Sequence, residues 1–214
     1  MRLLWQVLKG TLSDIAAEPF LLLVYNLLWL LFSLLVVTLP FALGGLFYAA
    51  REIGERRAVG WRTFFDGGRQ YAGLLYRWAA LNLVVGVTVI ANISFYGRLD
   101  QIYANVLQSL LISIGSVWLL LQLFVVPVIF RLQQPGLRVA LQDGFYLMLR
   151  HPGLSLVVAL IVISLVSLSA LVPIALAMAT GALIATLSNR MVAEELAWHT
   201  TGRGSARQHA NRER

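Results

Sequence analysis

The chain has no cysteine, only one lysine and few charged residues of either sign. The absence of cysteine excludes disulfides, thiolate metal ligands and a thiol nucleophile. Charged residues make up 13% of the 214 residues, about half the share typical of a soluble domain, whereas 59% are hydrophobic. A soluble fold with so little polar surface would aggregate, but lipid solvates apolar faces. The composition therefore predicts an integral membrane protein.

Motifs that would predict an enzyme or a metal site are also absent. The three histidines, His151, His199 and His209, have no metal-ligand spacing, and the sequence contains no His-Glu-x-x-His, Gly-x-Ser-x-Gly or phosphate-binding glycine loop. The apolar runs contain no Asp, Glu, Lys or Arg, which disfavours a proton-coupled pump. We expect no enzyme activity, no cofactor and no metal, although a membrane-embedded enzyme with an unrecognised motif stays open.

The basic residues outnumber the acidic ones, and the net charge is +7. A basic chain often binds nucleic acid, but here the charges lie between apolar runs. That placement is better explained by membrane topology and by contact with anionic headgroups. We therefore expect a lipid bilayer with anionic headgroups as a partner, and no nucleic acid.

Four runs without a charged residue are long enough to cross a bilayer core, which needs about 20 helical residues. They cover residues 20–39, 78–97, 101–130 and 152–189. Pro173 divides the last run into two short spans, because proline ends or kinks a helix. Segment 40–57 is a further span if Arg51 reaches the interface, and otherwise a re-entrant or interfacial helix. The sequence predicts an all-α, polytopic membrane bundle of about six transmembrane helices, or five if 40–57 is re-entrant.

The basic residues are distributed asymmetrically around these runs. With six crossings and both termini inside, 16 of the 17 fall on the inner side and only Arg98 lies outside. Without the span at 40–57, Arg2 and Lys9 would lie outside, which disfavours five spans. We predict a single transmembrane domain at 1–199 and a basic, disordered tail at 200–214, with both termini cytoplasmic.

Three segments between the runs have apolar residues at helical spacing, at 1–18, 61–77 and 137–150. We expect amphipathic helices that lie in the inner interface or pack on the ends of the bundle. For 61–77 we predict an interfacial helix, with arginines on anionic headgroups and aromatic rings in the headgroup layer: Arg62, Arg69, Arg77, Phe64 and Phe65. The alternative is a docking surface for a soluble partner.

Each of these segments precedes a pair of apolar runs, so the chain divides into three similar units, at 1–57, 58–133 and 134–190. Their junctions read Ala-Glu-Pro-Phe-Leu from Ala17, Arg-Trp-Ala-Ala-Leu from Arg77 and Arg-His-Pro-Gly-Leu from Arg150. We predict three copies of an interfacial helix followed by a two-helix hairpin. Membrane transporters often contain internal repeats, but repeats alone do not establish transport.

Polar and small residues inside the runs are the candidate site residues. Asn26 and Asn82 are predicted to form hydrogen bonds between helices, or to line a polar site at the membrane midplane. Small residues four apart let helix backbones approach closely, and they occur at Gly45, Ala49, Ala177, Gly181 and Ala185. We expect the helices that carry them to pack centrally.

The first hairpin resembles a known family. The stretches Asn-Leu-Leu-Trp-Leu at 26–30, Ser-Leu-Leu-Val-Val-Thr-Leu-Pro at 33–40 and Gly-Leu-Phe-Tyr at 45–48 resemble the signature of YesL-like membrane proteins, as do Trp-Arg-x-Phe-Phe at 61–65 and Phe-Tyr-Gly at 95–97. Leu35 departs from the family, which favours proline there. The resemblance covers most of the chain and is most specific over 26–65.

This resemblance implies a protein of the bacterial cytoplasmic membrane, associated by context with carbohydrate uptake. It suggests a non-enzymatic accessory or assembly protein whose partner is a membrane protein such as a transporter subunit. The alternative is a small transporter or channel with its site near Asn26 and Asn82. A transporter should contain a polar cavity that reaches the middle of the bilayer, whereas an accessory protein should form a closed, dry bundle.

Overall fold

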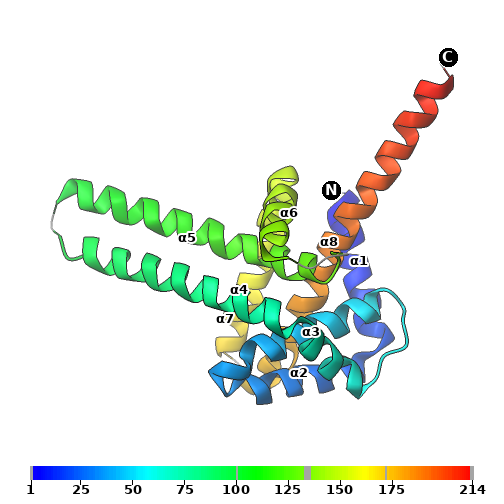
Figure 1. Ribbon diagram of the computed structural model, residues 1–214, viewed down its shortest axis with the longest axis horizontal. Coiled ribbons are helices and arrows are strands. Elements are labelled where there is room, and N and C mark those ends of the chain that lie inside the picture. The colour runs from blue at the N-terminus through cyan, green and yellow to red at the C-terminus, as the bar shows by residue number, and fades with distance from the viewer. Residues whose placement is uncertain (1, 100, 133–135, 172, 213–214) are drawn as a thin grey trace.

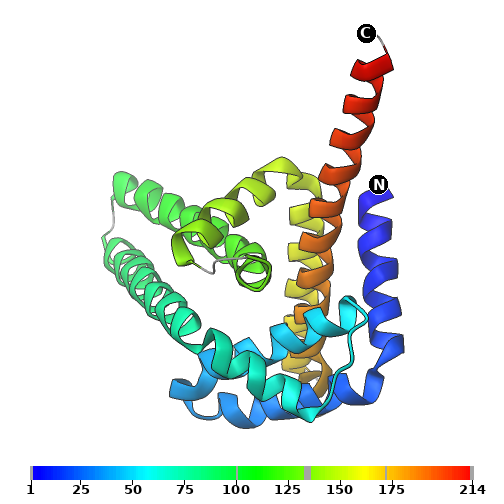
Figure 2. The same cartoon turned by 45° about the vertical axis from the view of Figure 1, so that its right-hand side comes forward.

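The computed structural model describes residues 2–99, 101–132, 136–171 and 173–212. Within these ranges all regular structure is helical, which confirms the predicted all-α class (Figures 1 and 2). The helices in chain order are α1 (Arg2–Ala17), α2 (Pro19–Ser33), α3 (Leu39–Gly54), α4 (Trp61–Tyr96), α5 (Ile102–Ile129), α6 (Leu137–Arg150), α7 (Pro152–Leu171) and α8 (Pro173–Arg212), with a 3-10 turn, η1 (Val36–Thr38), before α3.

Several of these helices are long and apolar enough to cross a membrane. In the described part of the chain four segments qualify by length and composition: Val36–Gly54, Trp61–Tyr96, Ile102–Ile129 and Pro152–Leu171. The first of them contains most of the doubtful segment 40–57. A fifth is added if the bent pair α1 and α2 is one broken span. The architecture is therefore compatible with a polytopic helical membrane protein.

The first predicted span, 20–39, is not one helix. Helix α2 has 15 residues and ends at Ser33, so it is about 22 Å long, which is shorter than a bilayer core of about 30 Å. Leu35 is extended, and the hydroxyl of Thr38 donates a hydrogen bond to the Leu35 carbonyl at 3.0 Å. Local bonds of this kind compete with the helical hydrogen-bond pattern. The chain therefore turns at 34–38 before α3 begins.

Prolines explain where the first and third amphipathic segments end. The residues before Pro19 and Pro152 leave the helical region, with φ and ψ of −140° and 57° at Glu18 and −126° and 66° at His151. A residue before proline avoids the α conformation, so α1 ends at Ala17 and α6 at Arg150. Between α1 and α2 the axis bends by 91°.

The second amphipathic segment, 61–77, does not form a separate helix as predicted. Residues 61–77 and 78–96 form one helix, α4, and not an interfacial helix followed by a separate span. The junction Arg77-Trp78-Ala79-Ala80 contains neither proline nor glycine, and Arg and Ala favour helix. Nothing at this junction ends the helix, so the predicted boundary at Arg77 is wrong.

Helix α8 also extends further than predicted. It runs from Pro173 to Arg212, so residues 200–212 are helical where we predicted a disordered tail, and 213–214 lie outside the described residues. Adding a residue to an existing helix avoids the cost of nucleation, which explains how a polar segment can continue a packed one.

The helices form three hairpins, α2–α3, α4–α5 and α7–α8. Both views show α4 and α5 side by side as a long arm that projects away from the other helices (Figures 1 and 2). Helix α3 packs on the first half of α4, where Gly44 and Gly45 meet residues between Phe64 and Leu75, while α6 packs on α5 and α1 packs on α8. As a result, the C-terminal ends of α3 and α5 meet the middle of α8, with α1 beside it, and this junction holds the candidate site.

Candidate functional site

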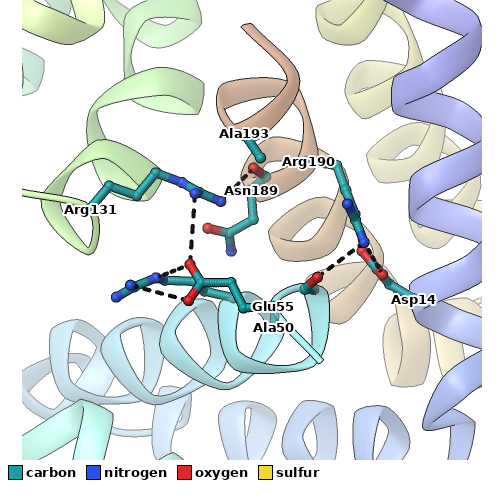
Figure 3. Close-up of a pocket in the computed structure, with 9 residues that line it drawn as sticks. Asp14, Ala50, Glu55, Arg131, Asn189, Arg190 and Ala193 are labelled. Atoms are coloured by element: carbon teal, nitrogen blue, oxygen red, sulfur yellow. Dashed lines mark hydrogen bonds and ion pairs between the residues drawn. The ribbon is translucent and has the colours of Figure 1, made fainter. Parts of the chain in front are cut away.

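A polar cavity of about 180 Å³ lies where α1, α3, α5 and α8 meet (Figure 3). Three arginines and two carboxylates line it together with small and amide side chains: Asp14, Ala50, Arg51, Gly54, Glu55, Arg131, Asn189, Arg190 and Ala193. We call this cavity and its lining the polar junction. Each of its arginines comes from the second helix of a different hairpin, or from the residues directly after that helix.

The three arginines connect the hairpins in a cycle. Arg51 on α3 donates a hydrogen bond to the carbonyl of Phe130 at the end of α5. Arg131 follows α5 and donates from Nη2 to the carbonyl of Asn189 on α8 at 3.1 Å. Arg190 on α8 donates from Nη2 to the carbonyl of Gly54, the last residue of α3, at 3.2 Å. Each arginine therefore holds the backbone of the next hairpin.

These contacts satisfy groups that a helix cannot satisfy by itself. The last four carbonyls of an α-helix have no intrahelical partner, and they carry the negative end of the helix dipole. Phe130 and Gly54 lie at such ends, so a guanidinium there both donates a hydrogen bond and compensates the dipole. Asn189 lies inside α8, which continues past the junction, so the cycle is not symmetric there.

A buried ion pair attaches α1 to the polar junction. The carboxylate of Asp14, whose side chain is 1% exposed, accepts hydrogen bonds from Nε and Nη2 of Arg190. Paired donors from one guanidinium fit a carboxylate in both distance and orientation. The pair therefore fixes how α1 lies against α8.

Glu55 is the shared acceptor on the other side of the cavity. Its carboxylate lies 2.7 Å from Nε of Arg51, 2.8 Å from Nη2 of Arg57 and 3.8 Å from Nη1 of Arg131. Figure 3 shows Glu55 and Arg131 facing each other across the cavity. One carboxylate thus serves three cations, and it compensates each of them only in part.

Arg131 is the least compensated of the three arginines that line the cavity. Burial lowers its pKa, the repulsion of Arg51 and Arg190 lowers it further, and the attraction of Glu55 only partly opposes this. Its Nε is buried and has no hydrogen-bond partner in the described part of the chain. The Oδ1 of Asn189 is likewise buried without a hydrogen-bond partner among the described residues. The Nδ2 of the same amide donates to the carbonyls of Phe47 and Ala185, both at 3.0 Å. The polar junction thus offers an unused donor and an unused acceptor.

The structure does not bring Asn26 and Asn82 into one site. Asn26 is fully buried between α2 and α8, where its Oδ1 accepts a hydrogen bond from the backbone N–H of Ala182 at 2.9 Å. Asn82 bridges α4 and α5: it accepts from Trp118 at 3.0 Å and donates to Gln122 at 3.4 Å. Each amide takes part in a separate helix–helix contact.

The predicted small residues lie at close helix contacts. A Cβ atom at Gly45 would lie 2.6 Å from the carbonyl oxygen of Phe64, and one at Gly181 would lie 2.7 Å from Oδ1 of Asn26. Ala49 and Ala185 are fully buried, whereas the side chain of Ala177 lies outside the described residues. Helix α3 thus approaches the backbone of α4 at Gly45, and α8 lies directly against side chains of α2 at Gly181.

Of the two aromatic rings predicted to enter the headgroup layer, Phe64 is buried more deeply than predicted. Phe64 is 0% exposed and stacks on Tyr25 with ring centroids 6.4 Å apart, so the predicted insertion of this ring into the headgroup layer is wrong. The cause is Gly45, which leaves room on α3 for the Phe64 ring. Phe65 is half-buried, and the three arginines of the segment are exposed: Arg62, Arg69 and Arg77.

In the sequence, Arg51, Arg131 and Arg190 stand out only as positive charges that indicate topology. The available signal was their position, because each ends the second apolar run of one of the predicted units. Asp14 gave no such signal, since its partner lies far away in the sequence.

Comparisons with family models, with curated proteins and with solved structures found no match to this chain. The resemblance to YesL-like proteins therefore stays a prediction. Within the described residues no group of three or more His, Cys, Asp or Glu side chains could hold a metal ion. The chemistry that the polar junction offers is recognition of a charged group by guanidinium and amide donors and acceptors.

Proposed function

We propose that this chain is a multi-pass protein of the bacterial cytoplasmic membrane that serves as a non-enzymatic accessory or assembly subunit of another membrane protein. The partner class, by resemblance, is a transporter subunit of a carbohydrate uptake system. The observation that carries the membrane part is the exposed apolar surface of the hairpins.

This surface is most extensive on the α4–α5 arm. Large apolar side chains stand exposed along both helices, including Leu83 at 68%, Ile90 at 66%, Ile102 at 86% and Leu119 at 69%. None of the most apolar stretch of α4 is buried within the molecule. Soluble monomers rarely expose apolar patches beyond a few hundred Å², so such an arm requires lipid or a membrane partner around it.

We further propose that the three units 1–57, 58–133 and 134–190 are repeats. The support is the cycle of arginines, in which one arginine on or directly after the second helix of each hairpin bonds the next hairpin. In the second unit the amphipathic segment is fused to its span as α4, whereas prolines separate the two in the first and third units.

The same cycle supports the proposed topology. Arg51, Arg131 and Arg190 line one cavity, so they share one side of the membrane. Positive residues accumulate on the cytoplasmic side, so we propose that the polar junction lies on that side and that both termini are cytoplasmic.

The cavities favour an accessory role over transport. The polar junction lies at helix ends, whereas the cavity of about 310 Å³ between α2, α3, α7 and α8 is lined by apolar side chains except for Ser169 and Thr180. Those two hydroxyls lie 2.5 Å apart and satisfy each other. A polar path towards the middle of the bilayer would need more polar lining than this.

Affinity purification of the full chain from its native membrane tests the role. We expect permease subunits of an uptake system to co-purify with the tagged chain and not with an equally tagged, unrelated multi-pass protein. A chain that purifies without partners and conducts solutes in proteoliposomes would instead establish the transporter alternative.

A further inference from the structure

We propose that the polar junction is a binding site for a phosphate group that still carries a proton, either inorganic phosphate or the phosphomonoester headgroup of a lipid. This site requires only the junction itself, so it can exist whether or not the protein is an accessory subunit.

The first reason is the charge around the cavity. Three guanidinium groups face two carboxylates in the lining, which leaves one positive charge for a ligand to compensate. The pair of Arg57 and Glu52 beside them adds no net charge, with 3.2 Å between Nη1 and Oε1. Glu194 lies outside the lining, 3.8 Å from Nη1 of Arg190, and offsets part of the positive charge on the Arg190 side but not at Arg131. An anion is therefore attracted to the side of Arg131, the arginine with the weakest compensation.

The second reason is the pair of unused polar atoms. Asp14 is occupied by Arg190, and the carboxylate of Glu55 is shared by its cations, whereas Nε of Arg131 and Oδ1 of Asn189 are buried without a partner among the described residues. Buried polar groups are almost always hydrogen-bonded, and leaving one unpaired costs roughly 1–3 kcal/mol. Arg131 and Asn189 line the same cavity, and Figure 3 shows the Asn189 side chain beside the pair of Arg131 and Glu55, so both atoms belong to one site.

These two atoms set the ligand chemistry. The N–H of Arg131 requires an acceptor, and guanidinium groups bind phosphate oxygens with good geometry. The side-chain oxygen Oδ1 of Asn189 requires a donor, which a P–OH group supplies and a sulfate ion lacks. The carboxylate of Glu55 repels a dianion, which also favours the protonated form. The junction therefore selects a protonated phosphate over sulfate.

Size and access allow this ligand. A volume of about 180 Å³ equals that of roughly six waters in the liquid, which accommodates a tetrahedral oxyanion with a few waters. The side chains of Arg51, Arg131 and Arg190 keep between 17% and 20% of their surface exposed, so the cavity is accessible from outside. In the proposed topology it lies at the level of the inner headgroups, where lipid and dissolved phosphate are both present.

Thermal unfolding of the full chain tests this site, in a maltoside detergent and a phosphate-free buffer. We expect inorganic phosphate to raise the midpoint in a concentration-dependent manner, and sulfate at equal ionic strength to raise it much less. Arg131→Gln and Ala193→Leu should weaken phosphate binding at least tenfold. The first removes the guanidinium donor together with its charge, and the second fills the cavity without a change of charge. Arg138→Gln, the same charge change at an exposed position on α6, should bind phosphate like the wild type.

Native mass spectrometry with added lipids separates the two sources. Retention of phosphatidic acid, a phosphomonoester, over phosphatidylglycerol, a diester without P–OH, identifies a lipid headgroup site, and loss of this retention in Ala193→Leu places it in the cavity. A midpoint shift with phosphate but no lipid retention identifies a soluble ligand. The proposal is overturned if neither ligand binds, if sulfate acts as strongly as phosphate, or if Ala193→Leu binds as the wild type does.

Discussion

At the scale of single residues, loss of the ion pair between Asp14 and Arg190 should lower the free energy of unfolding more than loss of any other ion pair described above. Asp14→Asn leaves the guanidinium of Arg190 partly buried, with the Gly54 carbonyl at 3.2 Å and the carboxylate of Glu194 at 3.8 Å as its remaining acceptors among the described residues. Breaking one side of a buried pair costs about 3–5 kcal/mol, and the 20% exposure of Arg190 moves the expectation to the lower end, about 3 kcal/mol. Denaturation in detergent should show this loss of unfolding free energy.

The matched control is Glu194→Gln on the neighbouring turn of α8. The Glu194 carboxylate lies 3.8 Å from Nη1 of Arg190 and its side chain is 25% exposed, so neutralising it should cost less than about 1 kcal/mol of unfolding free energy. Equal effects of the two variants would contradict the assignment of Asp14 as the principal partner of Arg190.

Glu195 should make stability depend on pH near neutrality. Its side chain is fully buried, and neither carboxylate oxygen has a hydrogen-bond partner in the part of the chain that the structure describes. Burial raises its pKa to about 7, against the attraction of Arg150. The folded state therefore binds a proton that the unfolded state releases near its ordinary pKa, so this contribution to stability is present below pH 4.5 and is lost as the pH rises to about 7.

The expected loss between these limits is about 3 kcal/mol. Unfolding midpoints at pH 5 and pH 8 measure it. Glu195→Gln should flatten the dependence and stabilise the protein at pH 8, whereas Glu194→Gln should keep the wild-type slope. A Glu195→Gln variant with an unchanged slope would show that another group titrates.

At the scale of helices, glycines decide how closely neighbours approach. Gly181→Leu would place a side chain against Asn26 and Trp29, whose nearest atoms lie 2.7 Å and 2.9 Å from the position of a Cβ. Overpacking of this kind costs about 1–3 kcal/mol or more, so the melting temperature in detergent should fall.

Gly86→Leu on α4 is the control, because nothing lies within 4 Å of a Cβ there. It should leave stability unchanged or raise it by up to about 1 kcal/mol, since leucine favours helix over glycine. If Gly181→Leu were equally harmless, the close contact between α2 and α8 would be absent.

The continuity of α4 can be measured directly. Spin labels at positions 69 and 87, both exposed, are separated by 18 residues, which corresponds to about 27 Å in one straight helix. A right-angled break at Arg77 would reduce this to about 19 Å at the same rise per residue. A distance near the shorter value would contradict one continuous helix and support the separate interfacial helix that the sequence predicts.

Local chemistry explains which parts of this fold can be predicted from sequence. Pro19, Pro152 and Pro173 act on their own neighbours, so the helix ends next to them follow from the sequence. The fusion of 61–77 with the following span was missed because amphipathic periodicity shows a face and not an end. The polar junction was missed because Arg51, Arg131 and Arg190 meet only through tertiary packing, which no local pattern reports.

At the scale of the whole molecule, three hairpins joined at one polar junction make the topology testable with few sites. The chain has no cysteine, so single cysteines can be introduced without background. We expect an impermeant thiol reagent to label Arg98→Cys in intact cells, and Arg69→Cys and Asp143→Cys only after permeabilisation, because the charge asymmetry predicts that these two positions are inside. All three positions are exposed. Labelling at 69 or 143 from outside would reverse the proposed orientation.

The pairing of Asp14 with Arg190 also has a consequence for biosynthesis. The two residues are 176 positions apart, so at about 5–20 residues per second the ribosome makes Arg190 roughly 9 to 35 s after Asp14. During that interval the carboxylate of Asp14 has no guanidinium from α8, and the cycle of arginines is open at its last member. A chain that ends before residue 190 should therefore be degraded faster than one that includes it, because the polar junction is incomplete until the third hairpin supplies Arg190.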